Sequence, residues 1–172
     1  MTIFMFENEI ATNQLMVNYL ILLASGIEDS ELDDQPCENF NPPRWILGHL
    51  AVYTDYALRL TGARFACPKE WHRAYARGSS SGSSPDERPS RTELLDAIVN
   101  GFQTVRDRCS QLSEEDLNKP HKVPFLKGTA LTTAGHVLAH LMTTHFAAHL
   151  GQLSAWRRLN GLENVEPAEP PA

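Results

Sequence analysis

The chain has few cysteines, and their arrangement excludes several kinds of site. Cys37, Cys67 and Cys109 are the only cysteines among 172 residues, and no two of them form a CxxC pair. Any intramolecular disulfide would leave one of them unpaired. We therefore interpret them as reduced thiols and expect a cytoplasmic protein.

Other sequence features that would point directly to a function are also missing. There is no glycine-rich nucleotide-binding motif, no P-loop and no HExxH motif, so a metalloprotease would lack its general base. No basic segment followed by an apolar one opens the chain, and the apolar stretch at residues 15–24 is too short to span a bilayer. We expect neither a signal peptide nor a membrane partner.

Clustered positive charge is absent as well. The chain carries 15 lysines and arginines against 21 acidic residues, for a net charge of −6, and its basic residues are scattered. Phosphate binding requires clustered basic side chains, so we expect no nucleic-acid partner. The length and the 42% of hydrophobic residues suit one domain with a sizeable core. We place this domain at residues 1–163, followed by a flexible tail at residues 164–172.

Apolar residues at helical spacing account for most of the chain. They predict four main helices, at about residues 7–25, 41–60, 90–112 and 131–159. Ser90 and Glu93 form a capping-box pattern, which marks the start of the third helix. No segment alternates between apolar and polar residues with period two, so we predict an all-α protein.

The segment between Gly62 and Pro89 is the least regular part of the chain. It contains a run of glycine and serine at residues 78–85, a composition that is typical of flexible connections. A long loop in a small domain is often a lid or a binding loop. An insertion without a role is the alternative interpretation.

Histidines give the strongest functional signal. His145 and His149 stand four residues apart in the last predicted helix, so their side chains lie one turn apart on the same face. His49 lies on the inward face of the second predicted helix. Three imidazoles without nearby thiols are typical of an open site for a divalent metal ion. We predict that His49, His145 and His149 bind such an ion, with buried and hydrogen-bonded histidines as the alternative.

The remaining histidines are expected to lie elsewhere. His136 and His140 fall on a different face of the last predicted helix, among small and polar residues, where they would pack an interface or form hydrogen bonds to the ligands. His72 and His121 are predicted to lie in solvated loops, although either could reach the mouth of the site.

Three motifs of the chain occur together in one known family. They are Pro43-Arg-Trp-Ile-Leu-Gly-His49-Leu, Ser90-Arg-Thr-Glu-Leu-Leu95 and His145-Phe-Ala-Ala-His149-Leu-Gly-Gln-Leu153. In this combination the chain resembles the DinB/YfiT-like superfamily of metal-dependent enzymes. The resemblance implies an up-down-down-up four-helix bundle. It also implies a site for zinc, nickel, manganese or iron, with His49, His145 and His149 as ligands. A common variant of the last motif has arginine where this chain has Leu150, so no contact by that arginine is expected.

The resemblance also implies thiol chemistry, because characterised relatives include transferases and isomerases that use thiols such as bacillithiol or mycothiol. We therefore predict a metal-dependent thiol S-transferase acting on a small-molecule thiol and an electrophilic substrate. A divalent ion would stabilise the thiolate at an open coordination position. Tyr53 and Asp55 are conceivable acid–base groups, although a core tyrosine and a surface aspartate are the simpler interpretation.

Two other functions remain open from the sequence. The same metal site could activate water and make the protein a hydrolase. Alternatively, the chain could be a metal-binding module without turnover, acting in a stress response or as a dimeric scaffold. We expect a homodimer, because relatives often pair and because small residues line one face of the last predicted helix: Thr143, Ala147, Gly151 and Ser154.

Overall fold

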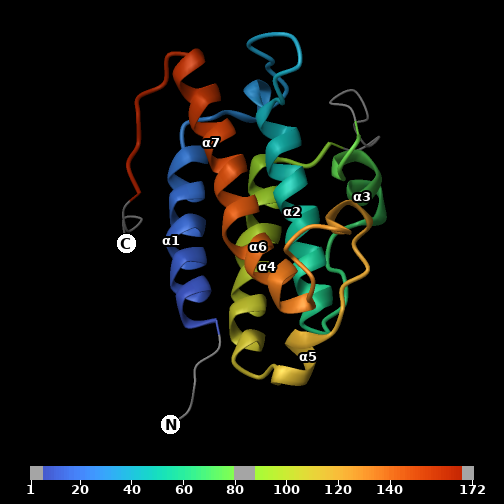
Figure 1. The fold of residues 1–172 in the computed structure, drawn as a ribbon. Helices are drawn as coiled ribbons and strands as arrows, with labels where there is room; N and C mark the ends of the chain where they lie inside the picture. The colour runs from blue at the N-terminus through green and yellow to red at the C-terminus, as the bar shows by residue number, and fades with distance from the viewer. Residues whose placement is uncertain (1–5, 80–87, 168–172) are drawn as a thin grey trace.

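The computed structural model describes residues 6–79 and 88–167 and is helical in its regular parts (Figure 1). The long elements are α1 (Glu7–Ala24), α2 (Pro43–Leu60), α4 (Arg91–Cys109), α6 (Ala134–Met142) and α7 (Thr144–Leu159). Short helices lie between them: η1 (Asp29–Glu31), α3 (Lys69–Tyr75), α5 (Glu114–Asn118) and η2 (Pro124–Leu126). Within the described residues, β-pairing is limited to one bridge between Pro120 and Thr133. The prediction of an all-α fold is confirmed.

Local sequence signals set the helix ends much as predicted. Ser90 and Glu93 exchange hydrogen bonds as a capping box at the start of α4. α2 begins at Pro43, where a missing N–H leaves no helical hydrogen bond unmade. Gly26 and Gly62 follow α1 and α2 with φ angles of 75° and 80°, the left-handed conformation that often ends a helix.

Hydrogen bonds between helix ends define the directions of the long helices. Arg157 near the end of α7 donates to carbonyl groups at the end of α1, so these two helices are parallel. Arg91 at the start of α4 also donates to the end of α1, so α4 is antiparallel to α1. Arg108 at the end of α4 donates to the carbonyl of Thr61 just after α2. The helices α1, α2, α4 and α7 therefore run up, down, down and up. The same directions can be followed in Figure 1 from the colour change along each helix.

The most buried long helix is α2. Every residue from Pro43 to Asp55 is buried, and Figure 1 shows α2 close to α3, α4 and α7. α7 contributes Phe146, whose ring meets Phe102 of α4 edge to face with centroids 5.1 Å apart. α7 also packs directly against α2, so the two helices that carry the predicted ligands lie side by side in the core.

The prediction of one continuous last helix is wrong. The helix begins at Ala134 and is interrupted at Thr143, where φ is −125° and ψ is −86°. The Thr143 hydroxyl donates to the carbonyl of Ala139 one turn earlier, a hydrogen bond that competes with regular helix geometry. A residue of α1 also stabilises the break. The buried side chain of Asn13 donates to the carbonyl of Met142, at 2.9 Å, and thereby satisfies this group at the end of α6.

In the segment between Gly62 and Pro89, the described residues 62–79 are more regular than predicted. It contains α3, and the ring of Tyr75 at the end of that helix is buried against α2. Most of the predicted flexible run, residues 80–85, lies outside the described residues. At the other end of the chain, Leu162 and Val165 pack against the core. The domain boundary at residue 163 stays a prediction.

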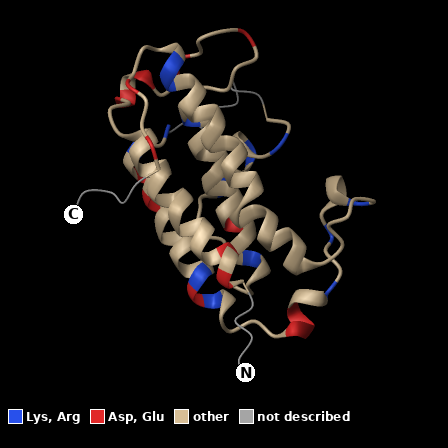
Figure 2. Ribbon diagram, turned by 60° about the vertical axis from the view of Figure 1, so that its left-hand side comes forward, with Lys and Arg blue, Asp and Glu red and all other residues tan. Residues whose placement is uncertain are grey.

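Charged residues are spread over the surface without a dominant sign. Figure 2 shows blue and red positions mostly toward the helix ends and in the connections, with the middle of the bundle largely free of them. Among the described helices, none combines the length and the apolar character that crossing a membrane requires.

Candidate metal site

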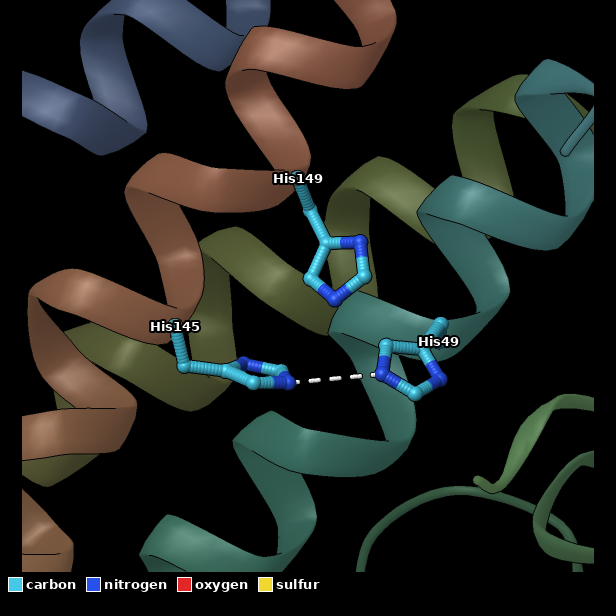
Figure 3. A group of neighbouring side chains, drawn as sticks. All are labelled: His49, His145 and His149. Atoms are coloured by element: carbon cyan, nitrogen blue, oxygen red, sulfur yellow. Dashed lines mark hydrogen bonds between the residues drawn. The ribbon is translucent and has the colours of Figure 1, made fainter. Parts of the chain in front are cut away.

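The three histidines chosen from the sequence converge on one point between α2 and α7. One nitrogen from each of His49, His145 and His149 lies within 4.8 Å of the other two. The Nε2 atoms of His49 and His145 are 3.3 Å apart. Figure 3 shows the rings of His145 and His149 projecting from α7 toward the ring of His49 on α2. The i, i+4 spacing within α7 and the packing of α7 on α2 produce this convergence.

Hydrogen bonds fix two of the three rings. The Nδ1–H of His49 donates to the carbonyl oxygen of Tyr75, at 2.7 Å. The Nδ1–H of His149 donates to the side-chain oxygen of Gln152, at 3.1 Å. Both oxygens can only accept, so the proton of each neutral ring lies on Nδ1 and the lone pair on Nε2. Such contacts orient metal-ligating histidines and set their tautomers.

His145 is held by stacking instead. Its ring lies against the ring of Tyr53 with centroids 4.4 Å apart and an interplanar angle of 22°. Its Nδ1 is buried and has no hydrogen-bond partner among the described residues. His145 is therefore the ligand candidate whose tautomer the surrounding protein leaves open.

Burial keeps the three rings uncharged. Burial, and after it the positive charge that neighbouring imidazoles would carry, lowers the pKa of His49 to about 4 and that of His145 to about 3. Burial also lowers the pKa of His149, and the hydrogen bond to Gln152 partly opposes this. A histidine must be neutral to bind a metal ion, so all three are ready to act as ligands at neutral pH.

The donor set fits a divalent transition-metal ion. Two nitrogen ligands at about 2.0–2.1 Å from a tetrahedral ion lie about 3.3 Å apart, which matches the separation of the His49 and His145 Nε2 atoms. Imidazole ligands suit zinc, nickel and iron. Three protein ligands also leave coordination positions open, as in catalytic rather than purely structural sites.

Comparison with known families agrees with this arrangement. The sequence model of the DinB superfamily matches residues 15–153, which include all three histidines. The chain belongs to the DinB superfamily. No curated protein is similar enough to the chain to count as a match. The superfamily is associated with metal ions, and this member has a histidine group that could hold one.

The placement of His140 corrects the expectation from the sequence. A continuous helix would turn His140 away from His145, but the break at Thr143 brings the two rings together, with centroids 5.7 Å apart. Nδ1 of His140 lies 2.6 Å from the hydroxyl of Thr144. His136 is exposed and is not part of the ligand group, and its Nδ1 accepts a hydrogen bond from the N–H of Thr132.

The two histidines that were predicted to lie in loops, His72 and His121, are not part of the ligand group. His121 is partly buried and its Nε2 contacts the carbonyl of Leu131. His72 lies in α3 instead of a loop, and its Nε2 donates to the carboxylate of Asp55, at 2.9 Å.

Asp55 is a buried structural residue and not the surface residue expected from the sequence. Its carboxylate is 1% exposed and accepts hydrogen bonds from the backbone N–H groups of Ala66 and Cys67, both at 2.8 Å, in addition to His72. It therefore holds the chain after α2 in place. Tyr53 is a core residue as expected, and its contact with His145 makes it part of the site.

Sequence reasoning missed the groups that orient the ligands. Tyr75 acts through its backbone carbonyl, which leaves no trace in the sequence pattern. Gln152 could have been found, because it stands three residues after His149 on the same side of a helix.

Proposed function

We propose that this protein is a divalent-metal-dependent enzyme that joins the sulfur of a low-molecular-weight thiol to an electrophilic substrate. The observation that carries the proposal is the convergence of three neutral imidazoles beside an apolar pocket of about 480 Å³. A purely structural histidine cluster needs no such space. An enzyme of this kind needs room for a second reactant next to the ligands, and pockets of this size are typical of small-molecule sites.

A divalent ion held by the three imidazoles would supply the nucleophile by lowering the pKa of a bound thiol. The protein's own residues position this chemistry. Tyr75 and Gln152 keep the Nε2 atoms of two ligands directed at the common point. Tyr53 and His140 both lie against the ring of His145 and both line the pocket, so a reactant in the pocket would lie beside the ligands.

The first test is metal content followed by turnover. Purified protein is analysed for bound metals, and the loaded protein is then given cysteine, glutathione, bacillithiol or mycothiol together with chlorodinitrobenzene, whose thioether product absorbs light. We expect one ion per chain and metal-dependent thioether formation. His149→Ala should lose both, because α7 then offers one imidazole instead of two. His136→Ala is the matched control and should keep both.

Two results would contradict the proposal. Stoichiometric metal with no turnover on any thiol would favour a metal-binding module. Ester or amide hydrolysis that needs the same metal, without thioether formation, would favour a hydrolase.

We also propose that the protein acts as a homodimer in the cytoplasm. The support for dimerisation is that Ala147 and Gly151 are exposed on α7 and thus are not used for packing inside the monomer. Light scattering at micromolar concentration tests this, and a monomeric mass would contradict it.

A further inference from the structure

The pocket beside the three imidazoles is enclosed by elements that are distant in the sequence. It lies between α2, α6, the residues that follow α3, and the segment at residues 122–126, which includes η2. Tyr53 and His140 line it, and the rings of both lie against that of His145, with centroids 4.4 and 5.7 Å away. A molecule in this pocket would therefore lie within one side-chain layer of the candidate metal ligands.

Most of the pocket wall is apolar. α2 and α6 supply an aromatic ring and aliphatic side chains, and the segment at residues 122–126 covers them from the other side. Beyond Tyr53 and His140, the apolar part of the wall from these two helices consists of Tyr56, Leu60, Val137 and Leu141. Such a surface favours an aromatic or alkyl group, because burying apolar area is the main favourable contribution to binding here.

The charged residues of the pocket all have the same sign. Arg59, Arg77 and Lys122 line it, and no acidic side chain is among its described lining residues. None of the three forms a salt bridge with the described part of the chain. The guanidinium of Arg77 lies 4.7 Å from the ring centre of Phe125, which holds this charge at the pocket. In a chain with a net charge of −6, a pocket with only cationic charges is a local exception.

We propose that this pocket binds a small amphipathic organic anion, with its apolar body between α2 and α6 and its carboxylate or sulfonate at Arg77 and Lys122. As a statement about the substrate, the inference rests on the proposed function, because this anion would be the electrophilic reactant. As a statement about binding, it depends only on the pocket and needs no metal ion.

The test is ligand binding to metal-free protein. Anilinonaphthalene sulfonate, an aromatic anion that fluoresces in apolar surroundings, is titrated first and then displaced by phenylbutyrate or by its uncharged amide. We expect saturable binding and displacement by phenylbutyrate at several-fold lower concentration than by the amide. An exposed ion pair contributes at most about 1 kcal/mol, so each cation is expected to account for about two- to fivefold in affinity.

Two variants and one control locate the site. Lys122→Gln should weaken phenylbutyrate binding about two- to fivefold and leave the amide unchanged. Val123→Trp should fill the pocket and reduce binding of both ligands. Lys127→Gln, which makes the same change one residue after this segment and outside this pocket, should bind like the wild type. Circular dichroism checks that each variant is folded.

The inference is overturned if the amide binds as tightly as the acid, or if Lys127→Gln and Lys122→Gln have equal effects. It is also overturned if the probe does not bind. His149→Ala separates this result from the proposed function, because its pocket is intact while its metal site is incomplete. If the anion binds but the metal-loaded wild type shows no turnover, the transferase proposal is contradicted and the anion-binding proposal is not.

Discussion

Replacing Gly48 by alanine tests how closely the metal site depends on packing around α2. A Cβ atom at this position would lie 2.4 Å from Cγ of Tyr75 and 2.5 and 2.7 Å from its two Cδ atoms. These ring atoms are close to the backbone of α3, so the ring cannot turn aside without moving that backbone. Tyr75 also provides the carbonyl that fixes His49. The substitution should therefore disturb both the core and the site.

The expected cost is the balance of two effects. Overpacking a well-packed core costs about 1–3 kcal/mol, whereas replacing glycine by alanine within a helix gains about 0.5–1 kcal/mol. We expect the free energy of unfolding of metal-free Gly48→Ala to fall by up to about 2.5 kcal/mol. Loss of a group that orients a ligand typically reduces metal affinity about 10- to 100-fold, so cobalt binding, followed by its visible spectrum, should weaken at least tenfold.

Two controls separate the clash from a general effect of adding a methyl group. Gly151→Ala changes a helical glycine near His149 that has no atom within 4 Å of an added Cβ, so it should be neutral or stabilising. In a Tyr75→Leu background, Gly48→Ala should cost much less, because the clashing ring is gone. Urea denaturation is done at a concentration at which all variants are monomeric, so that association does not contribute. Wild-type stability and cobalt affinity in Gly48→Ala would refute the reasoning.

Further outcomes follow from the same geometry. In chelated protein, the free energy of unfolding should fall as the pH is lowered from about 6.5 toward 4, because the unfolded chain binds protons that the buried imidazoles do not. The slope should be at most about 1.4 kcal/mol per pH unit for each imidazole, and a flat profile would contradict their burial. Asp55→Asn should lower the free energy of unfolding by about 1–3 kcal/mol, because the amide of asparagine cannot accept all three hydrogen bonds. Unchanged stability in urea would contradict the role of Asp55 in holding the chain after α2. Metal should raise the melting temperature at neutral pH and lose this effect only as the pH approaches about 4, where His49 in the folded protein becomes protonated; His149→Ala should abolish the effect at every pH.

The parts of the site that the sequence predicts are those that depend on spacing within one helix. The four-residue interval places His145 and His149 together, and the apolar neighbours of His49 turn it inward. These features need only the helical period. The family motifs then connect the two helices, which the period alone cannot do.

The parts that the sequence does not predict depend on contacts between distant residues. The helix break at Thr143 is stabilised by Asn13, which is 129 residues away from the carbonyl it satisfies. The burial of Asp55 could not be predicted, because its hydrogen-bond donors come from a connection whose sequence has no regular pattern. Since the break brings the ring of His140 to that of His145, the relation of the pocket to the metal ligands was equally beyond sequence reasoning.

The hydrogen bonds around the three imidazoles explain why the site can be formed before a metal ion arrives. His49 and His149 are oriented by oxygen acceptors that are themselves part of the fold, and the ring of His145 is stacked on Tyr53. Folding has therefore already desolvated and oriented the ligands, and metal binding need not order them. The remaining freedom is the proton of His145, whose Nε2 faces that of His49 at 3.3 Å. Since Nε2 of His49 carries a lone pair, the metal-free pair is favourable only if His145 donates from Nε2. Metal binding at this atom then requires that proton to move to Nδ1, so binding would change the tautomer of His145.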